Sequence, residues 1–465
     1  MLAYAHPTGF IDMVFSEIMQ RFQAQAPIPV MAQALLERVL VDDLLDACFE
    51  RVTQKQYTRE LLFSSVFDLM ALVVTNVFAS VHAAYASRKA DIGVTITSVY
   101  NKLNGLETAV SAALVKDTGV ELSAIVAELG GHCEPLLPGY RVKMLDGNCI
   151  EATEHRLAVL RDTAAGALPG KTLVVYDPQL EMAIDVFPCE DGHAQERSLL
   201  CRVTESIDPL DVFIMDRNFC VRQFLFDTAD RKSFFIVRHH ANFGYEALEE
   251  EQCAGEVETG QVYEQWITVI DSAEEKRKWR RVVLRLNKKT RDGDNQLVIL
   301  TNLPKEAAGA TLIAELYRKR WSIETMFQEL ESYLHSEINA LGYPRAALFG
   351  FCVSLVAYNI LAVLKAALRS VHGEKTITDN VSGYYIATEL ERTHEGMNVA
   401  LPASEWAVFA TLSRADFVKI LIQLAKNVQL EKYKKNRRGP KKPKQARKSS
   451  KTEPHVSTSK LLAKK

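Results

Sequence analysis

Hydrophobic periodicity changes twice along the chain, and this change constrains the fold more than any other feature. In residues 1–135 apolar side chains recur every three or four positions, as in residues 31–40 and 61–72, which predicts helices. In residues 140–302 short apolar or alternating runs predict strands. Helical spacing returns over residues 311–426. The sequence therefore predicts a strand-rich centre between two helical regions.

The predicted strands of the centre are interrupted by a stretch with helical spacing, residues 194–207. Strands and helices mixed in this way are typical of an α/β sheet. The predicted strands are 141–145, 172–176, 182–187, 212–215 and 233–237, followed by 262–270, 280–286 and 296–301.

The net charge of −2 conceals an uneven distribution of charge. Residues 430–465 contain 14 Lys or Arg and two acids, whereas the rest of the chain contains 42 Lys or Arg and 56 acids. A basic segment of this kind serves solubility or binds a polyanion, and its three prolines and few apolar residues predict disorder without a partner. Residues 1–135 hold nine basic and 15 acidic residues, so bulk charge gives no support for DNA binding there.

Several classes of protein are not supported by the sequence. The eight cysteines form no CxxC pair and are expected to be buried thiols in a reducing cytosol rather than zinc ligands. No phosphate-binding loop, dinucleotide fingerprint or GxSxG motif is present, so no nucleotide cofactor is expected. His239 and His240 are adjacent on a predicted strand and face opposite ways, so a shared ligand role is not expected.

Membrane insertion and export are also not expected. The first ten residues lack a basic segment followed by an apolar core, so no signal peptide is predicted. Residues 346–364 carry no charge and are long enough to cross a bilayer. Because they include Ser354, Tyr358 and Asn359, a buried core helix is the better interpretation.

Three acids stand out as candidates for metal-dependent chemistry. Asp146 follows a predicted strand and precedes Gly147, and Asp216 ends the apolar run 212–215. Glu324 lies on a predicted helix, residues 316–334, in a polar stripe. Turn-forming or capping aspartates and a solvated helix face explain the same residues. If the three converge, their oxygens suit two Mg²⁺ or Mn²⁺ ions, which activate water and stabilise a leaving oxygen.

The segment AELYRKRWSIETMFQELES, which follows TNLP at 301–304, resembles the signature helix of bacterial DDE transposases of the insertion-sequence-four family. Tyr317, Arg320 and Glu324 have the spacing of that family's Tyr-Arg-Glu motif. Asp146 in LDGN and Asp216 in MDRNF resemble its two catalytic aspartates, and the gaps of 70 and 108 residues fit. The resemblance covers roughly residues 30–430.

The resemblance implies a fold and a division into domains. The fold would be α/β, with an RNase H-like mixed-sheet catalytic core, a β-rich insertion and flanking helical regions. The implied parts are a helical N-terminal domain that could bind transposon ends (1–135), a catalytic core (136–240 and 303–345), an insertion (241–302), a helical C-terminal region (346–429) and a basic disordered tail (430–465).

The resemblance also implies an activity, cut-and-paste DNA transposition. Asp146, Asp216 and Glu324 would hold two Mg²⁺, with Mn²⁺ as a substitute. The first nick would free a 3′-OH that attacks the opposite strand, by way of a hairpin in some relatives, and then target DNA. Tyr317 and Arg320 would hold a phosphate near the cleaved bond. The partners would be transposon ends, target DNA and a second copy of the chain, in the bacterial cytoplasm at the nucleoid.

The predicted insertion contains a second candidate DNA contact. Residues 276–291 hold nine basic residues and no acid. Alternation places Trp279, Arg281 and Arg285 on one strand face, and a basic face with an exposed Trp suits phosphate contact and base stacking. Lys276, Arg277 and Lys278 begin the same strand. In related enzymes a Trp of the insertion stacks on a flipped base. Trp279 is the predicted counterpart and Trp266 the alternative, with Trp321 expected to pack; a solvated hairpin face explains the same pattern.

One position departs from the family pattern and keeps two other functions open. The family has Lys seven residues after its Glu, where this chain has Glu331. An acid cannot contact the DNA backbone as Lys does. A catalytically impaired DNA-binding relative or inhibitor of transposition is therefore an alternative, and so is a nuclease with the same core that performs no strand transfer.

Overall fold

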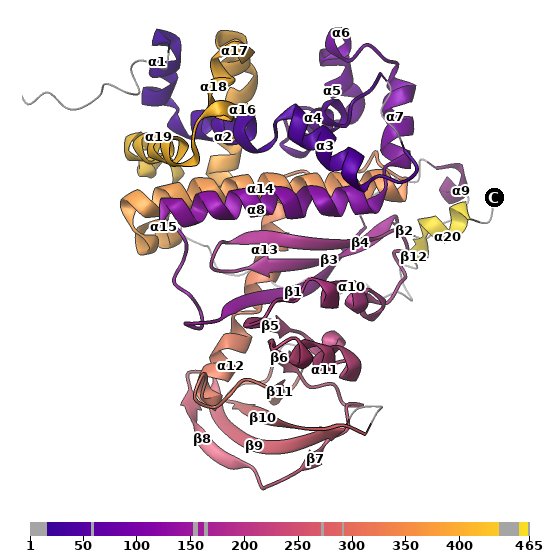
Figure 1. Cartoon of the computed structure of the whole chain (residues 1–465), viewed down its shortest axis with the longest axis vertical. Helices are drawn as coiled ribbons and strands as arrows, with labels where there is room; N and C mark the ends of the chain where they lie inside the picture. The colour runs from indigo at the N-terminus through magenta and orange to yellow at the C-terminus, as the bar shows by residue number, and fades with distance from the viewer. Residues whose placement is uncertain are drawn as a thin grey trace, which may run out of the picture.

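The computed structural model describes residues 16–56, 60–151, 157–161, 166–270, 274–290, 293–436 and 455–463. A layer of helices lies above a large mixed sheet, and the strands nearest the middle of the chain extend away from the helices (Figure 1). Helices from both ends of the chain share the upper layer, while the central region supplies the sheet. The predicted order of helical, strand-rich and helical regions is confirmed.

The N-terminal helices are α1 (Glu17–Gln25), α2 (Pro27–Val39), α3 (Asp42–Val52), α4 (Phe63–Val74), α5 (Val81–Ser87), α6 (Lys89–Ile92), α7 (Ile96–Gly105) and α8 (Thr108–Leu129). The C-terminal helices are α14 (Pro344–His372), α15 (Glu374–Asn380), α16 (Gly383–Ala400), α17 (Ala403–Trp406), α18 (Val408–Thr411) and α19 (Arg414–Asn427).

The long helices α8 and α14 pack side by side and cover one face of the sheet (Figure 1). α14 is almost entirely apolar and is buried along its length. It is the one helix of the described residues that is long and apolar enough to cross a membrane, and 94% of its most apolar window is buried. The prediction of a buried core helix over residues 346–364 is therefore confirmed.

Five strands form the half of the sheet beneath these helices, namely β1 (Arg141–Ile150), β3 (Gly170–Asp177), β4 (Met182–Cys189), β5 (Asp211–Met215) and β6 (Phe234–Arg238). Their order is β4-β3-β1-β5-β6, in which β3 runs antiparallel to both its neighbours and β1, β5 and β6 are parallel. This order, with the second strand reversed, is the RNase H-like topology. The predicted fold class is therefore confirmed.

The strands of the predicted insertion continue the same sheet instead of forming a separate one. They are β7 (Glu246–Ala247), β8 (Gln252–Val257), β9 (Gly260–Ile270), β10 (Lys276–Leu286) and β11 (Gln296–Thr301). β11 pairs with β6 and then with β10, which pairs with β9. The basic strand β10 is therefore an interior strand with a neighbour on each side.

The second face of the sheet is covered by short helices: η1 (Glu196–Leu199), α10 (Leu200–Glu205), η2 (Arg217–Phe219) and α11 (Arg222–Asp230). Their apolar residues and those of β5 and β6 form a separate, smaller core. The chain returns to the helical layer through α12 (Ala310–Arg318) and α13 (Trp321–Tyr333). α13 lies against β1 and so brings a helix to the centre of the sheet.

Two predictions about continuity are wrong. The single helix predicted over residues 316–334 is broken at Lys319 and Arg320 by a tight turn, in which each backbone N–H bonds to the carbonyl three residues earlier.

The basic tail predicted to be disordered over residues 430–465 has ordered ends, namely η3 (Leu430–Tyr433), β12 (His455–Ser457) and α20 (Thr458–Leu462). Lys460 and Ser457 bind Asp191, and β12 pairs with β2 (Gly166–Leu168). Residues 437–454 lie outside the described part.

Candidate active site

Asp146 and Asp216 lie next to each other on neighbouring parallel strands. The ladder between β1 and β5 ends at the pair Leu145 and Met215. Asp146 is the next residue of β1, and Asp216 is the residue that follows β5. Asp146 was expected to end its strand, but β1 continues to Ile150 because it pairs with β3 on its other side. The pairing explains why both side chains are held on rigid backbone at one point of the sheet.

Glu324 reaches the same place from α13, through Arg320. The Arg320 guanidinium donates from Nη1 to Asp146 Oδ2 at 3.1 Å and from Nη2 to Glu324 Oε1 at 2.6 Å. The exposed fractions of the three side chains are 13% for Arg320, 18% for Asp146 and 29% for Glu324. The Arg320 guanidinium therefore contacts two carboxylates, those of Asp146 and Glu324, which lie 178 positions apart in the sequence.

The carboxyl of Asp146 has an unusually high proton affinity. Its pKa is raised to about 7: burial is the largest cause and the like charges of Asp216 and Glu324 add to it, whereas the Arg320 guanidinium opposes the shift. These interactions show that the three acids lie within electrostatic reach of one another. Burial would lower the pKa of Arg320, but Tyr317, Asp146 and Glu324 raise it. The negative charge of the three acids therefore exceeds the positive charge that the Arg320 guanidinium supplies.

The turn after β5 fixes the position of Asp216. The Asn218 backbone N–H donates to Asp216 Oδ1 at 2.7 Å, and the Asn218 side chain donates to Glu196 Oε2 at 3.3 Å. The Glu196 carboxylate in turn lies so close to Gly147 that a Cβ at that position would collide with it. Glu196 and Asn218, which no sequence pattern singled out, thus connect the segments that carry the two aspartates.

The donor set fits a divalent cation, although the arrangement is not a finished metal cage. Carboxylate oxygens are the ligands that Mg²⁺ and Mn²⁺ prefer. Within the described residues, no group of three or more His, Cys, Asp and Glu side chains meets the geometry of a metal site. The Arg320 guanidinium contacts both Asp146 and Glu324 and so lies between their carboxylates. Metal binding there requires the guanidinium to withdraw.

Tyr317 lies at the end of α12, on the other side of the helix break from Glu324. Its side chain is 7% exposed, and burial raises its pKa. Arg320, Arg238 and Asp216 all act on it electrostatically. The Tyr-Arg-Glu spacing thus brings the three residues to one site through a turn, where a continuous helix was expected.

The prediction that Trp279 is an exposed stacking residue is wrong. Its side chain is 2% exposed. The ring packs against Phe226 of α11, Phe235 of β6 and Phe243, with centroids 4.9–6.3 Å away. Alternation assigned the strand face correctly, but α11 covers this end of the face and leaves no ring surface for a base.

The basic residues of β10 are mostly engaged with acids. Arg281 and Arg285 both bind Glu251, at 2.6 and 2.8 Å, and Arg277 binds Glu275 at 2.8 Å and also Asp230. Lys276 and Lys278 are exposed, and the Lys278 ammonium lies 4.5 Å from the centre of the Trp266 ring. Trp266 is half-buried, so it remains an accessible aromatic of the insertion.

Trp321 was expected to pack, and this expectation is wrong. Its side chain is 62% exposed, on the first turn of α13. The Arg320 guanidinium lies 5.6 Å from the centre of its ring. An exposed indole three residues before Glu324 is therefore an aromatic surface beside the acids.

A basic cavity lies beside Asp216 and was also missed. It measures about 380 Å³ and is lined by Arg217, Arg238, His239, His240, Asp294 and Gln296, among others. Arg238 is paired with Asp294 at 2.7 Å, whereas the side chain of Arg217 is exposed. His239 and His240 face different neighbours, as expected, but both line this cavity. The sequence signal was weak, because these residues come from three separate segments.

Two acids at neighbouring positions of the first and fourth core strands, with a third acid on a following helix, are an arrangement that suits metal-dependent phosphoryl transfer. The comparisons with known proteins point in the same direction. Residues 138–360, just under half of the chain, match the family model described as "Transposase DDE domain". The match includes all three acids.

Two known proteins are similar to the chain. "Putative transposase y4zB" of Sinorhizobium fredii (strain NBRC 101917 / NGR234) is 29% identical over 207 residues, which cover 42% of this chain and 52% of that protein. The chain thus matches about half the length of this relative. The cryo-EM structure of a piggyBac transposase synaptic complex with hairpin DNA aligns over 87% of this chain and 86% of that one, with 9% identity and a TM-score of 0.39, a likeness too low to carry an argument. The family match and the sequence relative support a DDE transposase.

Proposed function

We propose that the chain is a DNA transposase that cuts at the ends of a mobile element and joins them to target DNA. The observation that supports this proposal is that Asp146 and Asp216 follow one another across paired strands of an RNase H-like sheet while Arg320 contacts both Asp146 and Glu324, inside the segment that matches transposase DDE domains. Membership of the insertion-sequence-four family, which the Tyr-Arg-Glu motif suggests, is part of the proposal.

The three acids would hold the metal ions, two Mg²⁺ or Mn²⁺. Bound there, the ions would supply an activated water and stabilise the leaving oxygen. Asp146 and Asp216 offer oxygens from rigid strands, whereas Glu324 approaches from α13. Asn218 and Glu196 would act as positioning residues, because they fix the turn that carries Asp216.

Arg320 and Tyr317 would hold a DNA phosphate next to the cleaved bond. The Arg320 Nε–H is buried and has no acceptor among the described residues, so a phosphate oxygen can complete its hydrogen bonding. The basic cavity at Arg217 and Arg238 offers a second phosphate position on the Asp216 side. Electrostatic attraction at Arg320 and at the basic cavity would orient the DNA backbone across the three acids.

Further DNA contacts would come from exposed residues at a greater distance. Trp266 and Trp321 each offer a ring face for base stacking, at about 1–3 kcal/mol per base. Lys276, Lys278 and the basic residues after position 430 would neutralise phosphates. Arg281, Arg285 and Arg277 would contribute only after leaving their acidic partners. Joining two ends implies a dimer on DNA, in the bacterial cytoplasm.

The test uses the purified full chain and DNA fragments that carry the inverted repeats flanking its gene. With Mg²⁺ we expect a nick at the repeat boundary and then joined products with a target plasmid. Asp216→Ala and Glu324→Ala should remove both products while repeat binding persists. Binding without any nick in the unmodified chain would instead favour the impaired relative that Glu331 suggests. Nicking without joined products would favour a nuclease.

A further inference from the structure

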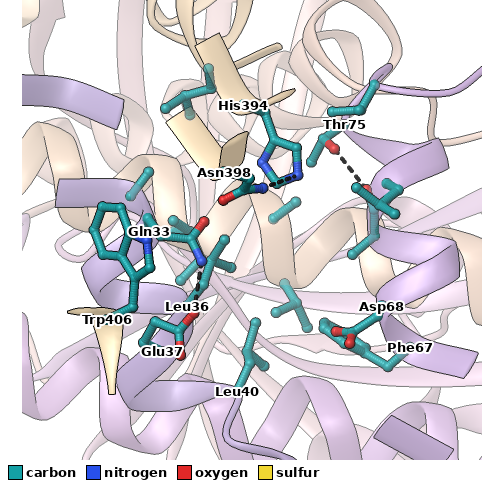
Figure 2. A pocket seen from close by; sticks show the side chains of 18 of the residues that line it. Gln33, Leu36, Glu37, Leu40, Phe67, Asp68, Thr75, His394, Asn398 and Trp406 are labelled. Atoms are coloured by element: carbon teal, nitrogen blue, oxygen red, sulfur yellow. Dashed lines mark hydrogen bonds between the residues drawn. The ribbon is translucent and has the colours of Figure 1, made fainter. Parts of the chain in front are cut away.

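A large cavity lies between the N-terminal and C-terminal helices, away from the three acids. Its volume is about 800 Å³, within the range of small-molecule sites. Figure 2 shows the side chains that line it, which come from α2 and α4 on one side and α16 and α17 on the other. The walls are mainly aliphatic and aromatic, with Leu36, Leu40 and Phe67 as examples. The cavity therefore offers apolar surface for a ligand of moderate size.

Acidic groups are concentrated on one side of this cavity. Glu37, Asp42, Asp43 and Asp68 line it, against one guanidinium, Arg88. Asp68 is an exposed residue that lines the cavity, and the described part of the structure shows no hydrogen bond or ion pair to its carboxyl. Its pKa is raised to about 6 in spite of the lowering effect of Arg88, mainly because neighbouring protein atoms desolvate the carboxyl. The like charges of Asp42 and Glu37 act in the same direction.

A second observation, independent of the acids, also points to a ligand. Trp406 is 1% exposed, and its indole Nε1–H has no hydrogen-bond partner among the described residues. Figure 2 shows the indole nitrogen on the edge of the ring that faces Gln33 and the cavity. The amide nitrogen of Gln33 donates to Glu37 at 2.8 Å, and its amide oxygen does not accept from the indole. A buried donor without an acceptor is costly, and a ligand acceptor would remove the cost.

We propose that this cavity binds a small organic ammonium ion with an apolar body and a hydrogen-bond acceptor. The ammonium would lie against Asp68 and Glu37, the apolar body against Leu36, Leu40 and Phe67, and the acceptor at Trp406. An anion is disfavoured by the four carboxylates, and a neutral ligand would leave the carboxyl of Asp68 unpaired. The other cationic group facing this space from α16 is His394, and burial lowers its pKa, so it does not neutralise the acids.

The site goes beyond the proposed activity but is connected to it structurally. Tyr333, the last residue of α13, lines the cavity, and Glu324 lies on the same helix. A ligand would also contact helices from both ends of the chain, and so would stabilise their packing. Binding itself needs neither DNA nor metal, so the test is independent of transposition.

The probe is 2-phenylethylammonium, measured by calorimetry or ligand-detected NMR with the full chain. Matched controls are 2-phenylethanol, which is neutral, and 3-phenylpropanoate, which is anionic. We expect the ammonium compound to bind at least about tenfold more tightly than either control, the difference expected of one charge-assisted hydrogen bond. Asp68→Asn should weaken ammonium binding by a similar factor, whereas Asp379→Asn, at an exposed position of α15, should leave it unchanged.

The role of Trp406 is tested with a second probe that carries an acceptor, 2-(4-methoxyphenyl)ethylammonium. It should bind more tightly than the unsubstituted compound, and Trp406→Phe should remove only this advantage. Thermal melting of each variant confirms that it is folded. Equal binding of the three charge types, ammonium binding that survives both Asp68→Asn and Glu37→Gln, or no binding at roughly 10 mM, where even a dissociation constant of 1 mM would give a clear signal, would each overturn the proposal.

Discussion

Asp146→Asn should stabilise the metal-free protein at pH 8, although it should abolish DNA cleavage. The pKa of Asp146 is raised to about 7 in the folded chain, against about 3.9 in an unfolded one. A difference of roughly three units corresponds to about 4 kcal/mol at 1.36 kcal/mol per unit. Because the carboxyl is 18% exposed and water screens part of the effect, we expect about 2–4 kcal/mol.

The sign follows from the direction of the pKa shift. A carboxyl whose folded pKa is raised contributes stability that is present below the unfolded pKa and is lost as the pH rises through the folded pKa. The unmodified chain should therefore lose this stability between about pH 4 and pH 7. Asn cannot ionise, so the variant keeps it, and the advantage of the variant should shrink as the pH falls towards 5.

Urea unfolding in EDTA at pH 8 and pH 5 measures the difference, with Asp208→Asn at an exposed position as the matched control. Adding Mg²⁺ should stabilise the unmodified chain and have little effect on Asp146→Asn, since the carboxylate is a proposed ligand. A variant less stable than the unmodified chain at pH 8, or an advantage of equal size at both pH values, would refute the reasoning.

Four further substitutions test the insertion and the signature helix. Trp279→Ala should lower the unfolding free energy by about 3–5 kcal/mol in urea melts, as for other buried aromatics, whereas Trp266→Ala should spare stability and slow only the steps after the first nick in a cleavage time course. Glu264→Gln should lower the unfolding free energy by about 3–5 kcal/mol in the same melts, because it leaves the fully buried Arg280 guanidinium without its carboxylate. An unchanged unfolding free energy would mean that the backbone carbonyls that also accept from Arg280 are sufficient partners. Glu331→Lys should tighten DNA binding and steepen the slope of log affinity against log salt by about 0.9; an unchanged slope would place the side chain away from the backbone.

Most of the fold followed from local patterns. Every predicted strand is present within a few residues of its predicted limits, since buried strands with apolar runs carry a strong signal. The pairing of the strands was harder to predict from the sequence. Nothing in residues 296–301 shows that β11 pairs with β6, which makes the predicted insertion a continuation of the core sheet. Sheet order depends on contacts between distant segments, and periodicity carries no information about them.

The errors in the site have a common physical cause. Period-two alternation identified which residues of β10 share a face, but not what covers that face. Trp279 lies under α11, and Arg280, on the opposite face of β10, is buried with Glu264 as partner. The break at Lys319 and Arg320 contains no Gly or Pro, and the spacing of apolar residues stays helical across it, so the sequence pattern did not reveal the break. The break nevertheless decides how Arg320 meets Asp146.

The position of Arg320 leads to a last prediction. Its guanidinium is bound to Asp146 and Glu324, yet the proposed mechanism requires it on a DNA phosphate. It cannot occupy both positions, so a divalent cation that replaces it between the carboxylates should free it for DNA. Binding of cation and DNA must then be reciprocally coupled.

Measured by fluorescence anisotropy, Ca²⁺, which should bind without supporting cleavage, should tighten the binding of a DNA end by roughly fivefold or more, the usual scale of such coupling. In Arg320→Gln the same addition should have little effect, and Ca²⁺ alone should bind this variant more tightly because its competitor is gone. Arg318→Gln, on the neighbouring exposed position, should keep the coupling. Coupling of equal size in Arg320→Gln would show that the cation acts on DNA directly, by neutralising phosphate charge, and that the contact of Arg320 with the carboxylates plays no part in it.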